Sequence, residues 1–122
     1  MNGSYLLDTN IIIALFARDP MVEERLVRAT SVYVPAIAIG ELFYGSYKST
    51  RVEENLSRIE AFAAQSAVLN CDMDTARHYG RIKDELRQKG KPVPENNIWI
   101  AALSVQHELR LITRDAHFTE VG

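Results

Sequence analysis

The sequence predicts an α/β protein in which a short parallel sheet of four or five strands is covered by helices on both faces. Two observations carry this prediction. Short apolar runs of strand length alternate along the chain with longer amphipathic segments of helical spacing. Strands that are separated by helices pair in parallel through right-handed crossovers, which place helices on the faces of the sheet.

Length and composition agree with this class. The 122 residues, with 47% hydrophobic and 25% charged side chains, match an average globular chain and exclude disordered and fibrous classes. We expect one domain, 1–122, because there is no repeat, linker or low-complexity tract. The longest apolar runs are too short to span a membrane, and no secretory signal is recognised. A single cysteine, Cys71, fits a reducing cytoplasm, and we interpret it as a packed structural thiol.

The first half of the chain contains three of the expected strands. They span 4–7, 32–34 and 67–69, with Asp8 at the end of the first and Pro35 at the end of the second. The expected helices span 10–17, a segment that begins at Asp19-Pro20, a segment that carries Ile39, Leu42 and Phe43, and 51–65.

The second half adds two helices and a fourth strand. A long helix follows Asp72 and ends at Gly90 and Pro92, and a mostly apolar helix, 98–107, is opened by 94–97. The strand 109–113 then ends at Asp115.

Charge is unevenly distributed, although the net charge is only −2 from 14 basic and 16 acidic residues. Between Arg77 and Lys91, six basic side chains accompany only two acidic ones. Two interpretations stay open for this run: ion pairing along a solvated helix face, or contacts to an RNA backbone. Phe43, Tyr44 and Tyr47 add an aromatic surface, although core packing explains Phe43 equally well.

Four oxygen-bearing side chains are expected to converge at one edge of the sheet. Asp8 and Asp115 end two strands, Glu41 follows the second strand near the start of its helix, and Asn97 lies at the start of the last helix. Gathered carboxylates repel one another, and a hard divalent cation relieves that repulsion. Such an ion polarises a phosphoryl oxygen and activates water, as phosphodiester hydrolysis requires.

Each of these residues also has an ordinary explanation. Asp8 and Asn97 are common helix caps, Asp115 is a common turn residue, Glu41 suits a solvated helix face, and Thr113 suits a strand. Only their order around one sheet therefore carries weight.

Four segments together resemble the PIN domains of the VapC toxin class. These segments, which span nearly the whole chain, are Leu7-Asp8-Thr9-Asn10, Ile39-Gly40-Glu41-Leu42 with Gly45, Pro94-Glu95-Asn96-Asn97-Ile98-Trp99-Ile100-Ala101-Ala102, and Leu111-Ile112-Thr113-Arg114-Asp115-Ala116-His117-Phe118. The resemblance implies a three-layer PIN fold, Mg²⁺ or Mn²⁺ as cofactor, RNA as substrate, a homodimer, and a small antitoxin protein that blocks the site. Carried over by position, it implies that Asp8, Glu41, Asn97 and Asp115 hold the metal. Thr113, Thr9 and Asn10 would then shape the site.

The chain departs from this pattern at two places. The pattern after Asn96 has aspartate, whereas this sequence has Asn97, which removes one negative charge and one potential base. Natural variation and an inactivating change that permits expression of a toxic enzyme both account for Asn97. The chain also stops at Gly122, where members of the class usually continue into a last short strand.

Two other functions are weighed against a ribonuclease toxin. Asn97 favours a catalytically impaired PIN-like module that binds RNA or an antitoxin, and metal affinity separates this from an active nuclease. A phosphatase or phosphoacceptor domain is disfavoured because the former needs an acid where Asn10 stands. The latter needs a lysine where Arg114 and Asp115 stand, and a glycine-rich phosphate loop is absent.

Overall fold

The computed structural model describes residues 3–116 and 118. The expectation about the end of the chain concerns residues 119–122, which lie outside this described part. In chain order the elements are β1 (Ser4–Leu7), α1 (Thr9–Phe16), α2 (Pro20–Val27), β2 (Ser31–Pro35), α3 (Ala36–Tyr47), α4 (Val52–Ala64), β3 (Ala67–Leu69), α5 (Met73–Lys89), α6 (Glu95–Gln106) and β4 (Arg110–Ile112).

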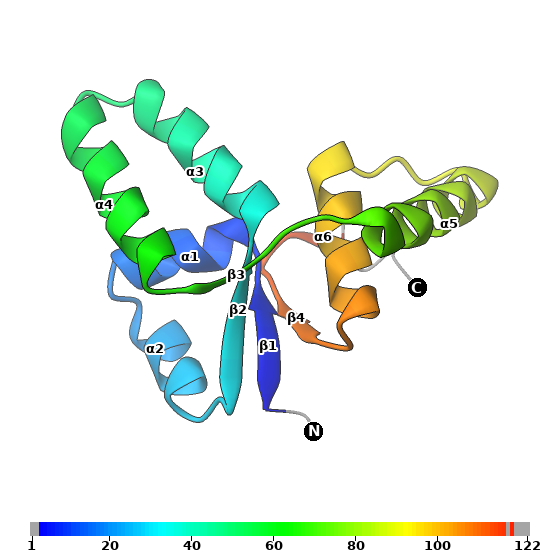
Figure 1. The fold of residues 1–122 in the computed structure, drawn as a ribbon, viewed down its shortest axis with the longest axis horizontal. Helices are drawn as coiled ribbons and strands as arrows, with labels where there is room; N and C mark the ends of the chain where they lie inside the picture. The colour runs from blue at the N-terminus through cyan, green and yellow to red at the C-terminus, as the bar shows by residue number, and fades with distance from the viewer. Residues whose placement is uncertain (1–2, 117, 119–122) are drawn as a thin grey trace.

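The four strands form one parallel sheet in the order β3-β2-β1-β4. In the register, Leu6 lies opposite Tyr33 of β2 and Leu111 of β4. All carboxyl ends therefore meet at one edge, which lies opposite the N-terminus in Figure 1. The predicted α/β class with a parallel sheet is confirmed.

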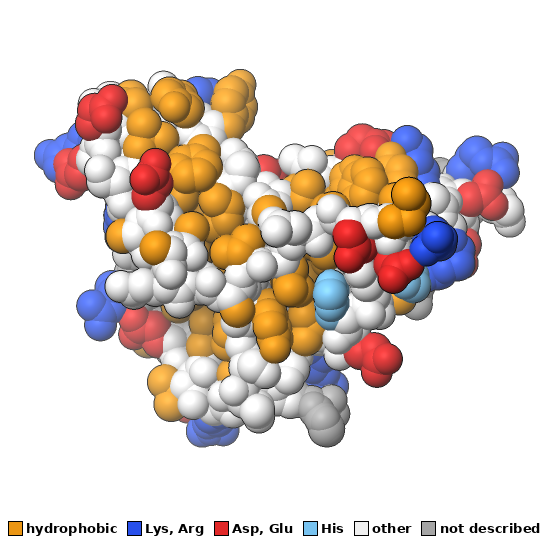
Figure 2. Space-filling model, in the orientation of Figure 1, with side chains coloured by type: hydrophobic (Ala, Val, Ile, Leu, Met, Phe, Trp, Pro, Cys, Tyr) orange, Lys and Arg blue, Asp and Glu red, His pale blue; other side chains and the backbone are white. Residues whose placement is uncertain are grey.

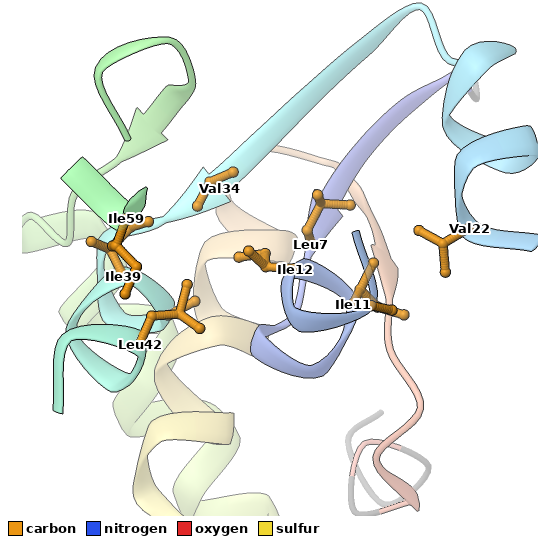
Figure 3. Packing of buried hydrophobic residues seen from close by; sticks show 10 residues of the cluster. Leu7, Ile11, Ile12, Val22, Val34, Ile39, Leu42 and Ile59 are labelled. Carbon is orange, nitrogen blue, oxygen red and sulfur yellow. The ribbon is translucent and has the colours of Figure 1, made fainter. Parts of the chain in front are cut away.

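The sheet separates two groups of helices, with α1 to α4 on one side and α5 and α6 on the other (Figure 1). Because successive strand residues point to opposite faces, Leu7 packs among residues of α1 to α4, whereas Leu6 packs against Ile100 and Leu103 of α6. Figure 3 shows the first of these clusters, in which Ile12 is fully buried. Full burial of each large aliphatic side chain contributes about 1.5–3 kcal/mol, so the core holds the corner after β1 in place.

Helix ends follow the sequence signals at α2 and α5. Asp19 caps α2 with Pro20 in the first position, and α5 ends at Gly90, whose φ of 68° suits glycine. The last long helix differs from the expectation. Pro94 occupies its N-cap without a side-chain hydrogen bond, and α6 starts at Glu95, so Asn97 lies inside the first turn. The interpretation of Asn97 as a helix cap is therefore wrong.

The interpretation of Cys71 as a packed thiol is also wrong, because its side chain is exposed. It lies between β3 and α5, outside the apolar clusters of the described residues. Burial of part of its surface, together with the negative charge of Asp72, raises the pKa of the thiol. Among the helices that the structure describes, none is long and apolar enough to cross a membrane.

Candidate active site

Asp8 occupies the corner between β1 and α1, at the carboxyl edge of the sheet. Its side chain is only 4% exposed. The backbone N–H of Asp8 donates to the carbonyl of Ile112 at 3.0 Å, which ties the corner to β4. Oδ1 accepts from the Thr9 N–H at 2.7 Å and Oδ2 accepts from the Thr113 hydroxyl at 2.6 Å. Asp8 is thus a helix cap, as its ordinary explanation proposes, and also a buried acid at the strand edge.

Thr113 connects the turn after β4 to this corner. Besides donating to Asp8, its Oγ1 accepts from the Asp115 N–H at 2.9 Å. The backbone N–H of the adjacent Arg114 donates to Oδ1 of Asn10 at 3.3 Å. The guanidinium of Arg114 donates to Oδ2 of Asp19 at 2.9 Å. These bonds hold Asp115 beside the β1–α1 corner.

The first turn of α6 places Asn97 against Asp115. Nδ2 of Asn97 donates to Oδ2 of Asp115 at 2.9 Å, and Asn97 is only 7% exposed. An aspartate in this position could not donate to Asp115 in this way, because an ionised carboxylate only accepts hydrogen bonds. The amide therefore turns a repulsive contact into an attractive one.

Glu41, half-buried on α3, completes the cluster. The Thr9 hydroxyl donates to one of its oxygens, and Nδ2 of Asn96 donates to the other at 3.2 Å. This contact of Asn96 was not predicted from the sequence. Its only signal was the position next to Asn97 at the start of a helix, and the bond depends on how α6 docks beside α3.

Electrostatics at Asp8 show that these acids interact. The pKa of Asp8 is raised chiefly by burial, and the negative charges of Glu41 and Asp115 raise it further. The hydrogen bonds from Thr113 and Thr9 lower the pKa but do not outweigh burial. The fold therefore holds an ionisable group where its charged form is disfavoured.

The described part of the chain contains no group of three or more Asp, Glu, His or Cys side chains arranged to hold a metal ion. In the present arrangement the Glu41 carboxylate accepts hydrogen bonds from Thr9 and Asn96. The Asp115 carboxylate accepts one from the Asn97 amide. The available donor set is three carboxylates and two amides, all of them hard oxygen ligands.

Two hollows flank Glu41. The first, the α1–α4 pocket, has a volume of about 220 Å³ and is lined by Thr9, Ile13, Phe16, Glu41, Leu42, Gly45, Ser46, Asn55, Arg58 and Ile59. The second, the α3–α6 groove, has about 560 Å³ and is lined by Ala36, Ile37, Gly40, Glu41, Tyr44, Cys71 and Asn96. Figure 2 shows the surface hollowed between the lobe of α3 and α4 and the lobe of α5 and α6.

The basic run on α5 is largely neutralised by acidic neighbours. Its ion pairs within the described residues are Arg77–Asp74, Arg81–Glu85, Lys83–Glu95 and Arg87–Asp84. The structure supports the ion-pairing interpretation of this run. Unpaired positive charge was the reason to expect RNA contacts there, and most of these cations are paired.

Comparison with known proteins gives one family. The family model described as "PIN domain" matches residues 5–122. The chain is similar to the ribonuclease VapC2 of Haemophilus influenzae, with 38% identity over 115 residues, covering 91% of this chain and 86% of that protein. It is also similar to the tRNA(fMet)-specific endonuclease VapC of Shigella flexneri, with 34% identity over 121 residues, covering 97% and 92%.

Solved structures give the same result. The chain superposes on the crystal structure of DNA-bound VapBC from Salmonella typhimurium with a TM-score of 0.88 and 31% identity, covering 99% of this chain and 93% of that chain. The sequence resemblance and the fold that it implies are therefore confirmed.

Proposed function

The chain belongs to the PIN-domain family, and from this premise we propose that it is a metal-dependent endoribonuclease and the toxin of a toxin–antitoxin pair. Its relatives are named a ribonuclease and a tRNA endonuclease, and a solved neighbour is a VapBC assembly. These names favour cleavage of RNA phosphodiesters over a module that only binds.

One observation carries the proposal for the site. Asp8 is buried at the carboxyl edge of the sheet, with Glu41 and Asp115 near enough to raise its pKa. A fold gains no stability from gathering carboxylates in this way, since burial and repulsion both disfavour the charged forms. Carboxylates gathered at one edge supply the negative charge and the oxygen ligands that a divalent cation requires.

The carboxylate and amide oxygens of these residues are ligands of the type that Mg²⁺ and Mn²⁺ take. We assign Asp8, Glu41 and Asp115 as carboxylate ligands and the amide oxygen of Asn97 as a neutral one. When bound, the cation supplies polarisation of a phosphoryl oxygen and activation of water. Carboxylates that now accept hydrogen bonds from Thr9, Asn96 and Asn97 would have to reorient toward the cation.

The remaining work belongs to the protein's own side chains. Thr113 holds Asp8 and the Asp115 backbone at once, so one hydroxyl sets the relative position of two acids. Thr9 and Asn96 fix Glu41 in the same way. A carboxylate of this cluster is the base available to take the proton from an attacking water.

Asn97 sets the expected level of activity. Replacing a carboxylate by an amide removes one negative charge from the cation site and one possible base. We therefore propose that the chain as written is a weak nuclease whose loss lies mainly in metal occupancy.

We propose as partners an RNA substrate, a cognate antitoxin protein and a second copy of this chain, and as location the cytoplasm. The likeness to VapBC assemblies supports the antitoxin. The α1–α4 pocket starts at Thr9 and Glu41 and continues over Ile13, which is 53% exposed. A protein segment seated there would cover one side of the site.

Matched preparations test the function directly. The chain as written and its Asn97→Asp variant are incubated with a mixed RNA pool, with and without Mn²⁺. Asp8→Asn in the Asn97→Asp background, purified identically, reveals any contaminating nuclease. We expect Mn²⁺-dependent cleavage by Asn97→Asp, weaker cleavage by the chain as written, and none above background by the double variant. Cleavage that persists in EDTA, or no cleavage by any form, would overturn the proposal.

A further inference from the structure

The groove beside Glu41 contains side chains that the metal site does not use. On α3, Ile37, Gly40, Glu41 and Tyr44 lie three and four residues apart, so they form one stripe along the helix. The same spacing continues to Lys48, the C-cap of α3. The stripe therefore runs from the proposed catalytic carboxylate at Glu41 to a cation at the far end of the helix.

Tyr44 is placed as an open aromatic platform in this stripe. The residue is 65% exposed and forms part of the groove wall. A tyrosine that served only the core would be covered by apolar neighbours, as Leu42 is at 7% exposure. Tyr44 lies one helical turn from Glu41, about 4.5 Å along the axis at 1.5 Å per residue.

Lys48 supplies the charge that an RNA strand needs. Its Nζ lies 4.6 Å from the centroid of the Tyr44 ring, a cation–π distance. Within the part of the chain that the structure describes, Lys48 makes no ion pair. Its charge is thus available to a phosphate, in contrast to the paired cations of α5.

Gly40 is one of the residues that line the groove. A Cβ added there would meet no atom within 4 Å, so the glycine is not required by close packing. The groove, with a volume of about 560 Å³, is lined by Tyr44 and also by Asn96 and Cys71.

We propose that the α3–α6 groove binds the RNA strand next to the bond that is cut, with a base stacked on Tyr44 and a phosphate contacted by Lys48. This inference rests on the proposed ribonuclease function and names the substrate subsite of that site. Every base has a π-face, so stacking on tyrosine accepts any base, whereas the lysine reads only the backbone. The subsite therefore adds affinity for single-stranded RNA and little sequence preference.

The test measures RNA affinity rather than cleavage. Fluorescein-labelled single-stranded oligoadenylate is titrated with the chain as written in Mg²⁺, and anisotropy is followed over a range of salt concentrations. Tyr44→Leu should weaken binding about fivefold or more, and Tyr44→Phe should not, because the phenyl ring still stacks. Lys48→Gln should reduce the steepness of log K against log salt by about 0.7, the single-strand value for one phosphate.

The chain offers matched controls. Tyr47, equally exposed at 66% on the same helix, does not line the groove, so Tyr47→Leu should leave RNA affinity unchanged. Arg51, paired with Glu54, serves as the control for Lys48, and Arg51→Gln should leave the salt dependence unchanged. Gly40→Leu should weaken binding by filling the groove, with melting curves reporting that the fold is retained.

Equal losses for Tyr44→Leu and Tyr47→Leu, or no RNA binding by the chain as written, would overturn the inference. Sedimentation measurements of the oligomeric state test whether a second copy of the chain fills the groove instead. If Tyr44→Leu dissociates a dimer and leaves RNA affinity unchanged, the groove is an interface between copies and the inference is overturned. The proposed function fails separately, through absent cleavage by Asn97→Asp, because the binding assay requires no turnover.

Discussion

Asp8 and Asp72 are two of the aspartates that cap helices in this molecule, and their surroundings shift their pKa values in opposite directions. Asp8 caps α1 and Asp72 caps α5. Asp72 is exposed, and its Oδ1 accepts from the Thr75 N–H at 3.1 Å and from Nε2 of Gln106 at 2.9 Å, which lowers its pKa. Asp8 also accepts two hydrogen bonds, yet burial and neighbouring acids raise its pKa.

The difference separates a carboxylate whose ionisation stabilises the native state, Asp72, from one whose ionisation destabilises it, Asp8. At Asp72 the charged form is the favoured form, so ionisation stabilises the native state. At Asp8 the charged form is disfavoured, because the carboxyl group is buried and lies near the negative charges of Glu41 and Asp115. Both residues give the same sequence signal, an aspartate before a helix, and only the surroundings distinguish them.

The largest expected effect concerns catalysis. In the Asn97→Asp background, Asp8→Asn should reduce RNA cleavage in Mn²⁺ at least about hundredfold, because a lost metal ligand withdraws several kcal/mol of transition-state stabilisation. Asp72→Asn in the same background should change the rate by less than about twofold. Comparable losses for the two variants in single-turnover assays would remove the distinction between the two caps.

Restoring the charge at position 97 should have the next largest effect. A unit charge about 4 Å from another is worth up to about 4 kcal/mol at an effective dielectric near 20, and about 1.4 kcal/mol is tenfold. We expect Asn97→Asp to raise cleavage at limiting Mn²⁺ at least about tenfold, and high Mn²⁺ to narrow the gap. Rates measured over a Mn²⁺ series check this, and superimposable curves would show that position 97 has no part in metal binding.

Stability without metal should move in opposite directions for the two aspartates. The raised pKa of Asp8 means that the folded state holds its proton more tightly than the unfolded state does. Its contribution therefore falls as pH rises from about 3.8 through the folded pKa, and is lowest at neutral pH. Asp8→Asn should raise the melting temperature in EDTA at pH 7 by about 2–5 °C, and this gain should vanish in acid.

The contribution of Asp72 to stability depends on pH in the opposite direction. Its lowered pKa means that its contribution is fully present above about pH 3.8 and is lost as pH falls through the folded pKa. Asn can still cap the helix but loses the charge-assisted bonds from Thr75 and Gln106. Asp72→Asn should therefore lower the melting temperature slightly at pH 7 and not in strong acid. Equal melting temperatures for the chain as written and for Asp72→Asn across the whole pH range would contradict this assignment.

The smallest effects are expected on the exposed face of α5. Arg81 pairs with Glu85 at 3.3 Å, and both side chains are about half exposed, so the pair contributes little. Arg81→Gln should shift the melting temperature by less than about 2 °C and RNA affinity by less than about twofold. A large loss of RNA affinity in the same anisotropy assay would show that α5 is part of the RNA-binding surface.

The local parts of the structure could be predicted because their causes are local. Apolar spacing, the Asp19-Pro20 start and the Gly90 end place the elements within a few residues of the observed bounds. The ends of the strands then predict that Asp8 and Asp115 approach each other. What could not be predicted depends on docking: that Asn97 donates to Asp115 from inside α6, and that Asn96 reaches Glu41.

Charge runs and lone cysteines were less informative for the same reason. The acid partners of the α5 cations include Asp74 and Glu95, which lie outside or at the margin of the basic run. The exposure of Cys71 depends on the path between β3 and α5, which apolar spacing does not determine. Conversely, the four-residue spacing of Tyr44 and Lys48 predicts that they are neighbours on one helix. That Lys48 forms no ion pair among the described residues appears only in the three-dimensional structure.

Calorimetric titration of Mn²⁺ into the Asn97→Asp variant and into its Asp8→Asn double variant tests the central claim most directly. RNA cleavage is measured at each Mn²⁺ concentration on the same preparations. We expect saturable Mn²⁺ binding that parallels the rise in cleavage, and the loss of both when Asp8 is replaced. Mn²⁺ binding that is unchanged by Asp8→Asn, or cleavage that does not follow metal occupancy, would contradict the assignment of these carboxylates as the metal site of a ribonuclease.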